Sequence, residues 1–210
     1  ASPRGIRAYR RFRNDTMVTP GFYLRNLALV ERYRNVAGAV VECGVWKGGM
    51  IAGMASVLGP DREYYLFDSF EGLPPAQAID GESALRWQAS TDSPWYFDNC
   101  AADIRFAEDA MRRAGARDVH LIRGLFDQTL PGFVPRSPIA ILRLDGDWYA
   151  STMTCLTHLY PHVARGGLII IDDYHTWDGC ARAVHDYLSR HSTPDRISQY
   201  GDEICYIVKR

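Results

Sequence analysis

The sequence lacks the features that mark several large classes of protein. Its five cysteines are scattered and include no CxxC pair, which argues against a disulfide framework and a structural zinc site. No run of about 18 apolar residues and no hydrophobic leader is visible, so we expect neither a membrane span nor a signal peptide. The formal net charge of -1 offers no overall attraction to nucleic acid or to a membrane. We therefore expect a cytoplasmic protein whose partner is a small molecule.

What the sequence does contain is a regular alternation of short apolar runs and helix-like stretches. The runs expected to form strands are 39–43, 64–67, 119–122, 139–144 and 168–171, with 203–208 as a further edge strand. The stretches expected to form helices are 16–35, 48–58, 104–114, 151–160 and 181–188. This pattern is typical of an α/β fold whose mostly parallel sheet has helices on both faces. The length of 210 residues fits a single domain, 1–210.

Two segments stand outside this alternation. Residues 1–38 form an N-terminal arm and helices, and the arginine-rich beginning is interpreted as a solvated, mobile arm rather than one that binds nucleic acid. Residues 73–101 form a long insertion that contains prolines and interleaved aromatic side chains. Insertions of this length are usually functional or disordered, and the aromatics favour a lid. Those aromatics would either close over a ligand or pack the lid against the domain: Trp87, Trp95, Tyr96 and Phe97.

Parallel sheets bind ligands beyond the carboxyl ends of their strands, so the residues at those ends are the ones to inspect. After the first strand, VECGVWKGG (41–49) places Glu42 just before Gly44, Val45 and Gly48. Glycines in such a turn let a ligand approach the backbone closely, although a tight turn alone would also need them. The pattern is not GxGxxG, which disfavours a nicotinamide dehydrogenase. An acidic residue before the first glycine suits a ligand that carries an ammonium group.

The second strand ends in Asp68, within LFDSFEGLP (66–74), which also holds Ser69 and Gly72. An acidic residue at this place in the fold is positioned to hydrogen-bond the hydroxyls of a ribose. The same aspartate would also serve as a helix cap, and the two roles are compatible.

Four carboxylates follow two later strands. Asp145 and Asp147 come after 139–144, and Asp172 and Asp173 come after 168–171. If these strands are neighbours, the carboxylates converge and repel one another unless a divalent cation binds them. Oxygen ligands favour Mg²⁺, Mn²⁺ or Ca²⁺ over Zn²⁺, while the alternative is a set of unrelated turn and cap aspartates. His175 lies close behind and is either a contact of the site or an ordinary loop residue.

Taken in order, these motifs resemble the macrocin O-methyltransferase family, whose members methylate sugar hydroxyls of macrolides and aminocoumarins. The resemblance covers about residues 14–210 and rests on the combination of the following pieces: Thr16-Met17-Val18, VECGVWKGG (41–49), LFDSFEGLP (66–74), LRLDGDWYAST (142–152) and GGLIIIDDY (166–174). It implies a Rossmann-like class I methyltransferase fold that uses S-adenosyl-L-methionine and Mg²⁺ in antibiotic biosynthesis. It also implies a small-molecule acceptor and a homo-oligomer.

The resemblance also implies roles for individual residues. Asp145, Asp172 and Asp173 would bind the metal, Asp147 would be the general base, and His175 is the second catalytic candidate. The residues implied to hold the cofactor come from four segments: Thr16, Glu42, Gly44, Val45, Gly48, Asp68, Ser69, Gly72 and Gly124.

Other functions remain open on the sequence. The acceptor is alternatively a nucleotide sugar or a vicinal diol such as a catechol-like phenol. A metal-dependent phosphohydrolase is a weak rival, because its aspartate pair normally follows the first strand and not the fourth. A partner protein that binds the cofactor without catalysis is the non-enzymatic alternative, and the intact set of four aspartates argues against it.

Overall fold

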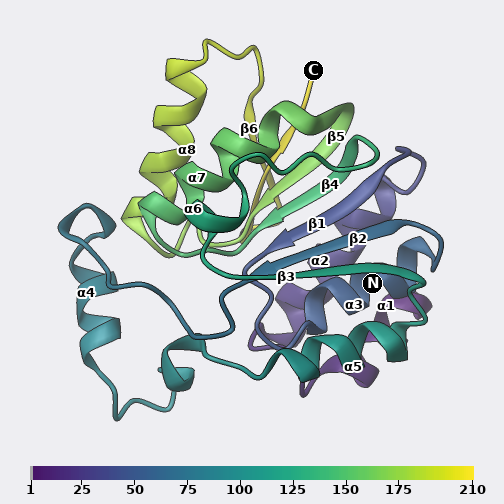
Figure 1. The fold of residues 1–210 in the computed structure, drawn as a ribbon, viewed down its shortest axis with the longest axis horizontal. Helices are drawn as coiled ribbons and strands as arrows, with labels where there is room; N and C mark the ends of the chain where they lie inside the picture. Colours follow the sequence, from purple (N-terminus) through teal and green to yellow (C-terminus); the bar gives the residue numbers. More distant parts are fainter. Residues whose placement is uncertain (1) are drawn as a thin grey trace.

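The computed structural model of the protein describes residues 2–210, and a seven-stranded sheet runs through its centre (Figure 1). The order is β3-β2-β1-β4-β5-β7-β6, and β7 runs in the direction opposite to that of the other six strands. The strands are β1 (Ala39–Cys43), β2 (Glu63–Asp68), β3 (Asp118–Arg123), β4 (Ile139–Leu144), β5 (Val163–Ile171), β6 (Ile197–Tyr200) and β7 (Ile204–Val208). The predicted α/β class and mostly parallel sheet are confirmed.

Helices cover both faces of the sheet, as Figure 1 shows. One face carries α1 (Pro3–Phe12), α2 (Pro20–Arg32), α3 (Gly49–Leu58) and α5 (Ile104–Ala114). The other face carries α6 (Phe126–Thr129), α7 (Tyr149–Leu159) and α8 (Asp178–Arg190), and a short 3₁₀ turn, Tyr160–His162, joins α7 to β5. Successive side chains of a strand point to opposite faces, so each central strand feeds two cores. Val40 of β1 packs into one core and Val41 into the other.

The C-terminal strands correct one prediction. Residues 203–208 were expected to form an edge strand, but β7 lies between β5 and β6 and buries Ile204, Cys205 and Ile207. The edge strand on this side of the sheet is β6, which the sequence did not predict. Its four residues, Ile197–Tyr200, are too short and too polar to show a clear alternation.

The N-terminal segment corrects another. Instead of a mobile arm, Pro3–Phe12 is a helix that packs against α2 and α3, and its buried residues Gly5, Ala8 and Phe12 follow helical spacing. Ser2 caps the helix, since its hydroxyl accepts a hydrogen bond from the amide of Gly5 at 3.0 Å. The arginines of the helix are exposed, as predicted.

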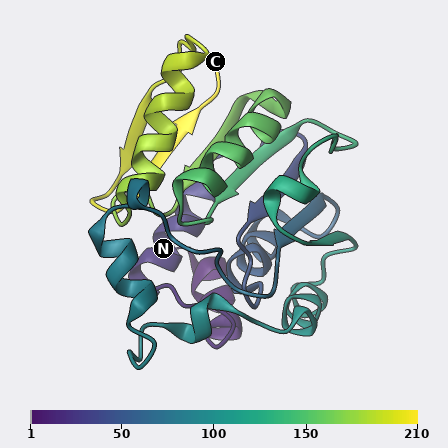
Figure 2. The same cartoon turned by 60° about the vertical axis from the view of Figure 1, so that its left-hand side comes forward.

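The insertion at 73–101 is only partly irregular. It contains α4 (Glu82–Ala89) and two 3₁₀ turns, Ala78–Asp80 and Phe97–Cys100. Figures 1 and 2 show α4 standing away from the sheet, beside the edge where β1, β2 and β4 end. No helix among residues 2–210 is both long and apolar enough to cross a bilayer.

The burial pattern of α1 makes a stability prediction. Phe12→Ala removes a fully buried ring, so it should lower the free energy of unfolding by about 3–5 kcal/mol. Ile6→Ala on the same helix is the matched control, because Ile6 is 39% exposed and its loss should cost about 1 kcal/mol or less. Urea denaturation measures both, and equal losses would show that α1 does not pack as a folded element.

Candidate active site

A cavity of about 390 Å³ opens beyond the carboxyl ends of β1, β2, β4 and β5. Most residues implied for the cofactor, the metal and the base line it: Thr16, Glu42, Gly44, Val45, Asp68, Ser69, Gly72, Gly124, Asp145, Asp147, Asp172 and Asp173. Segments from nearly the whole length of the chain therefore meet at one place, as expected for ligands of open α/β sheets.

Gly48 and His175 do not line this cavity. Gly48 precedes α3 with a φ of 80°, and a Cβ there would lie 2.9 Å from Cα of Ala107, so the position needs glycine for backbone reasons. His175 is exposed and packs edge-on against Tyr174, with ring centroids 5.0 Å apart. Neither position supports the contact that the sequence analysis expected.

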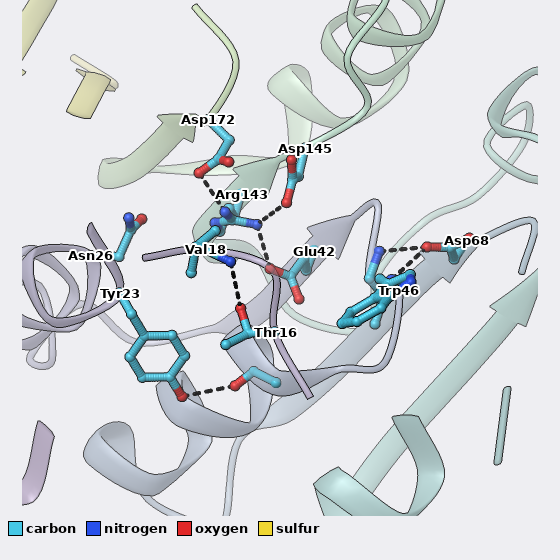
Figure 3. Close-up of polar contacts among 12 residues, drawn as sticks. Thr16, Val18, Tyr23, Asn26, Glu42, Trp46, Asp68, Arg143, Asp145 and Asp172 are labelled. Carbon is cyan, nitrogen blue, oxygen red and sulfur yellow. Dashed lines mark hydrogen bonds and ion pairs between the residues drawn. The ribbon is translucent and has the colours of Figure 1, made fainter. Parts of the chain in front are cut away.

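The buried guanidinium of Arg143 lies at the centre of the site (Figure 3). Nη1 donates to Oε1 of Glu42 at 2.8 Å and to Oδ2 of Asp145 at 2.7 Å, and Nη2 donates to Oδ1 of Asp172. The pairing of β1 with β4 sets Arg143 directly beside Glu42 on one face of the sheet. The guanidinium thus joins Glu42, near the end of β1, to two of the four later aspartates.

Glu42 is 1% exposed, and its second oxygen, Oε2, has no hydrogen-bond partner among the described residues. Burial raises the pKa of Glu42 to about 8, although Arg143 acts in the opposite direction. An unsatisfied buried acceptor on the wall of a cavity is costly unless a ligand supplies a donor. The Oε2 atom therefore suits a cationic donor such as an ammonium group.

Asp68 uses its carboxylate to shape the loop after β1. Oδ2 accepts from the amides of Val45 at 2.6 Å and Trp46 at 2.8 Å (Figure 3). Oδ1 accepts from the amide of Phe70 at 2.7 Å. A carboxylate has about four acceptor positions, so capacity for a hydroxyl donor remains. Both roles considered from the sequence, the turn-capping one and the ligand-binding one, are compatible with this geometry.

The segment before α2 closes another side of the cavity. The carbonyl oxygen of Asp15 accepts from the amide of Gly49 at 2.9 Å, and the hydroxyl of Tyr23 donates to the carbonyl oxygen of Gly49 at 2.8 Å. Thr16 sits beside these contacts, and its hydroxyl accepts from the amide of Val18 at 3.4 Å. The N-terminal residues are therefore fixed to the start of α3, where they can contact a ligand.

Three carboxylates that line the cavity form a compact acidic group. Asp145, Asp147 and Asp173 each offer an oxygen, and these oxygens lie within 4.8 Å of one another. Burial and the neighbouring carboxylates raise the pKa values of Asp147 and Asp173. Asp172, implied as a metal ligand, is bonded through Oδ1 to Arg143 instead of belonging to this compact group. The donor set is all oxygen, which fits Mg²⁺ or a similar hard cation.

Aromatic rings also line the cavity, among them Trp87 and Trp95. Trp87 of α4 packs against Trp148 and Trp177 with centroids 6.2 and 6.0 Å apart, so it fastens the insertion to the domain. Trp95 differs from Trp87 in exposure, because it is 71% exposed. Of the two roles considered for these aromatics, packing of the lid therefore applies to Trp87, while Trp95 is available to a ligand.

Comparison with known proteins shows the family to which the chain belongs. The sequence profile of the macrocin-O-methyltransferase (TylF) family matches residues 24–209. The chain belongs to this family. Its fold is the class I fold of S-adenosyl-L-methionine-dependent methyltransferases: the solved structure of the O-methyltransferase NovP superposes with a TM-score of 0.77 at 28% identity, covering 93% of this chain and 82% of NovP.

Two curated relatives show how far the similarity extends. The 8-demethyl-8-(2,3-dimethoxy-alpha-L-rhamnosyl)-tetracenomycin-C 4'-O-methyltransferase of Streptomyces olivaceus is 37% identical over 174 residues, which is 78% of this chain and 63% of the relative. The mycinamicin III 3''-O-methyltransferase of Micromonospora griseorubida is 35% identical over 182 residues, or 81% of this chain and 68% of the relative. The chain thus spans only 63% and 68% of the lengths of these two relatives.

Two important residues of this family member went unnoticed in the sequence analysis. Arg143 carried a signal, because a charged residue within a buried strand requires a partner of opposite charge. Trp177 donates from Nε1 to Oδ1 of Asp147 at 2.8 Å, and no sequence pattern connects two residues so far apart in the chain.

The raised pKa values predict how the stability of the folded protein depends on pH. The folded protein keeps protons on Glu42, pKa about 8, and on Asp172, pKa about 7, that the unfolded chain releases near pH 4–5. The folded state therefore binds more protons between about pH 5 and pH 8, and the free energy of unfolding decreases as pH rises through this window. In EDTA, we expect the melting temperature to fall from about pH 5 to pH 8.

Mg²⁺ binds ionised carboxylates, so its stabilising effect should be larger at pH 8 than at pH 5. Differential scanning calorimetry with Mg²⁺ or EDTA at the two pH values measures both effects. Asp173→Asn is the control and should lose most of the Mg²⁺-dependent shift. An equal shift at both pH values would argue against binding at these carboxylates.

Proposed function

We propose that this chain is an S-adenosyl-L-methionine- and Mg²⁺-dependent O-methyltransferase that methylates a sugar hydroxyl of a glycosylated natural product. The observation that carries the proposal is one cavity lined by two chemically distinct groups of side chains. Glu42 and Asp68 are one group, and the acidic group of Asp145, Asp147 and Asp173 is the other. The names of the tetracenomycin and mycinamicin relatives support a methyl acceptor of this class.

The residues that would hold the cofactor are inferred from the polar atoms that are available on the cavity wall. Oε2 of Glu42 would accept from the ammonium group of the methionine part, and Thr16 would close this side. Asp68 would accept from the ribose hydroxyls while it keeps the turn after β1 in shape. Ser69, Gly72 and Gly124 line the same cavity and would contact the remainder of the nucleoside.

Asp145 and Asp173 would hold the cation, and Asp172 would join them through the oxygen that Arg143 does not use. When bound, the methyl donor supplies an activated methyl group, and the cation supplies positive charge that lowers the pKa of a nearby hydroxyl. The chain would hold both within one cavity, which would favour reaction by proximity and orientation.

Asp147 is the general base of this proposal. Oδ1 is occupied by the indole of Trp177, whereas no described residue hydrogen-bonds Oδ2. Oδ2 would take the proton of the acceptor hydroxyl as the oxygen attacks the methyl group. Burial raises the pKa of this carboxyl, which makes it a stronger base than an exposed aspartate. His175 has no part in this step, because it is exposed and outside the cavity.

A nucleotide sugar or a catechol-like vicinal diol remains the alternative acceptor, because two adjacent oxygens of either molecule would bind a cation held by the same acidic group. A cytoplasmic location and a homo-oligomer remain predictions from the sequence.

Calorimetric titration of S-adenosylmethionine and S-adenosylhomocysteine into the protein, with Mg²⁺ and with EDTA, tests the class. We expect both ligands to bind, after which glycosylated acceptors, nucleotide sugars and catechols are assayed for methyl transfer. Failure of both ligands to bind to the folded protein would contradict the proposal. Binding without transfer to any acceptor would favour the non-catalytic alternative.

The role of Asp147 is tested by Asp147→Asn, which removes the basic oxygen with little change in size. We expect turnover to fall by about 10²–10⁴-fold, while S-adenosylhomocysteine binds nearly as in the wild type. Steady-state kinetics and calorimetry measure the two effects. Unchanged turnover would exclude Asp147 as the base.

A further inference from the structure

The side chain of Asp147 is held by a donor from a distant part of the chain. The indole Nε1 of Trp177 donates to Oδ1 at 2.8 Å. The backbone of Asp147 is fixed separately, since its amide donates to Oδ2 of Asp173 at 3.1 Å and its φ is 59°. The backbone contacts therefore fix the position of the main chain at Asp147, and the indole fixes the orientation of its carboxylate.

Trp177 is itself clamped by two other rings. Its centroid lies 5.4 Å from that of Trp148 and 6.0 Å from that of Trp87, and both rings are steeply inclined to it. Those rings are anchored in turn, because Nε1 of Trp148 donates to the carbonyl oxygen of Pro74 at 2.9 Å and Nε1 of Trp87 donates to that of Trp95 at 3.0 Å. Packing on two sides leaves the indole little freedom to leave Asp147.

We propose that Trp177 is a positioning residue that holds Oδ1 of Asp147 and thereby directs Oδ2 toward the acceptor hydroxyl. This inference rests on the proposed function, in which Oδ2 takes the proton. A carboxylate with one oxygen fixed by a hydrogen bond cannot rotate freely about its Cβ–Cγ bond. Orientation of a base within hydrogen-bond reach of its proton is what general base catalysis requires.

The inference differs from two simpler roles for Trp177. If the indole only filled space in the aromatic cluster, its N–H group would not matter. If it were a stacking surface for the acceptor, which its place on the cavity wall allows, its loss would weaken acceptor binding. A positioning role instead lowers the rate of the bound complex and leaves binding nearly unchanged.

Trp177→Phe keeps an aromatic ring and removes the N–H donor. We expect kcat to fall by about 10–100-fold, while the acceptor KM and the Kd of S-adenosylhomocysteine stay within about two-fold of wild type. Tyr149→Phe is the matched control: the hydroxyl of Tyr149 donates to Asp186 at 2.8 Å, outside the cavity, so kcat should stay within about two-fold. A raised KM with unchanged kcat, or unchanged kinetics altogether, would overturn the inference.

A second measurement does not depend on activity. The chain has five tryptophans, so ¹⁵N NMR should show five indole N–H signals, and Trp177→Phe identifies one of them. We expect Asp147→Ala to shift this signal more than the other four. An unmoved Trp177 signal would mean that the hydrogen bond does not form in solution. If the wild type transfers no methyl group, the proposed function fails; if it is active and Trp177→Phe matches it, only this inference fails.

Discussion

The site depends on how one buried guanidinium is shared among three carboxylates. Arg143 is 1% exposed and contacts Glu42, Asp145 and Asp172 at the same time. A buried charge is strongly destabilising without partners, and here each partner comes from a different strand or strand end. The interaction fixes β1, β4 and the end of β5 relative to one another at the place where the cavity opens. Displacement of any of these strands would leave a buried charge uncompensated.

The strand order explains why these charges meet. From β1 the sheet extends in both directions, through β2 to β3 on one side and through β4 to β5 on the other. Connections after β1 and β4 therefore leave toward opposite faces, and a crevice opens between them. The close packing of the two loops is evident at Gly44, where a Cβ would lie 1.7 Å from the carbonyl oxygen of Asp145. Glycine at this position is required by the neighbouring loop, independently of any ligand.

The sequence predicted those parts of the site that depend on local pattern. Acidic residues at or beside the ends of apolar runs identified the strand ends, namely Glu42, Asp68 and the later aspartates. The parallel sheet brings these residues together around one cavity. It did not predict features that depend on pairing between distant segments. The middle position of β7 follows from its antiparallel pairing with both neighbours, and Trp177 reaches Asp147 only because α7 and α8 begin side by side. His175 illustrates the converse, since proximity in sequence to Asp173 did not bring it into the cavity.

Arg143 neutralises some of the carboxylates at the site and leaves others without a cationic partner. Its hydrogen bonds reach Glu42, Asp145 and Asp172, but none reaches Asp147 or Asp173. Nor does it satisfy Oε2 of Glu42. The acceptors without a cationic partner, Oε2 of Glu42 and the carboxylates of Asp147 and Asp173, thus all belong to residues that line the same cavity. A cationic ligand at Glu42 and a divalent cation at the acidic group would complete the charge balance in two separate places. Arg143 therefore stabilises the folded site while Oε2 of Glu42 and the carboxylates of Asp147 and Asp173 stay available to ligands.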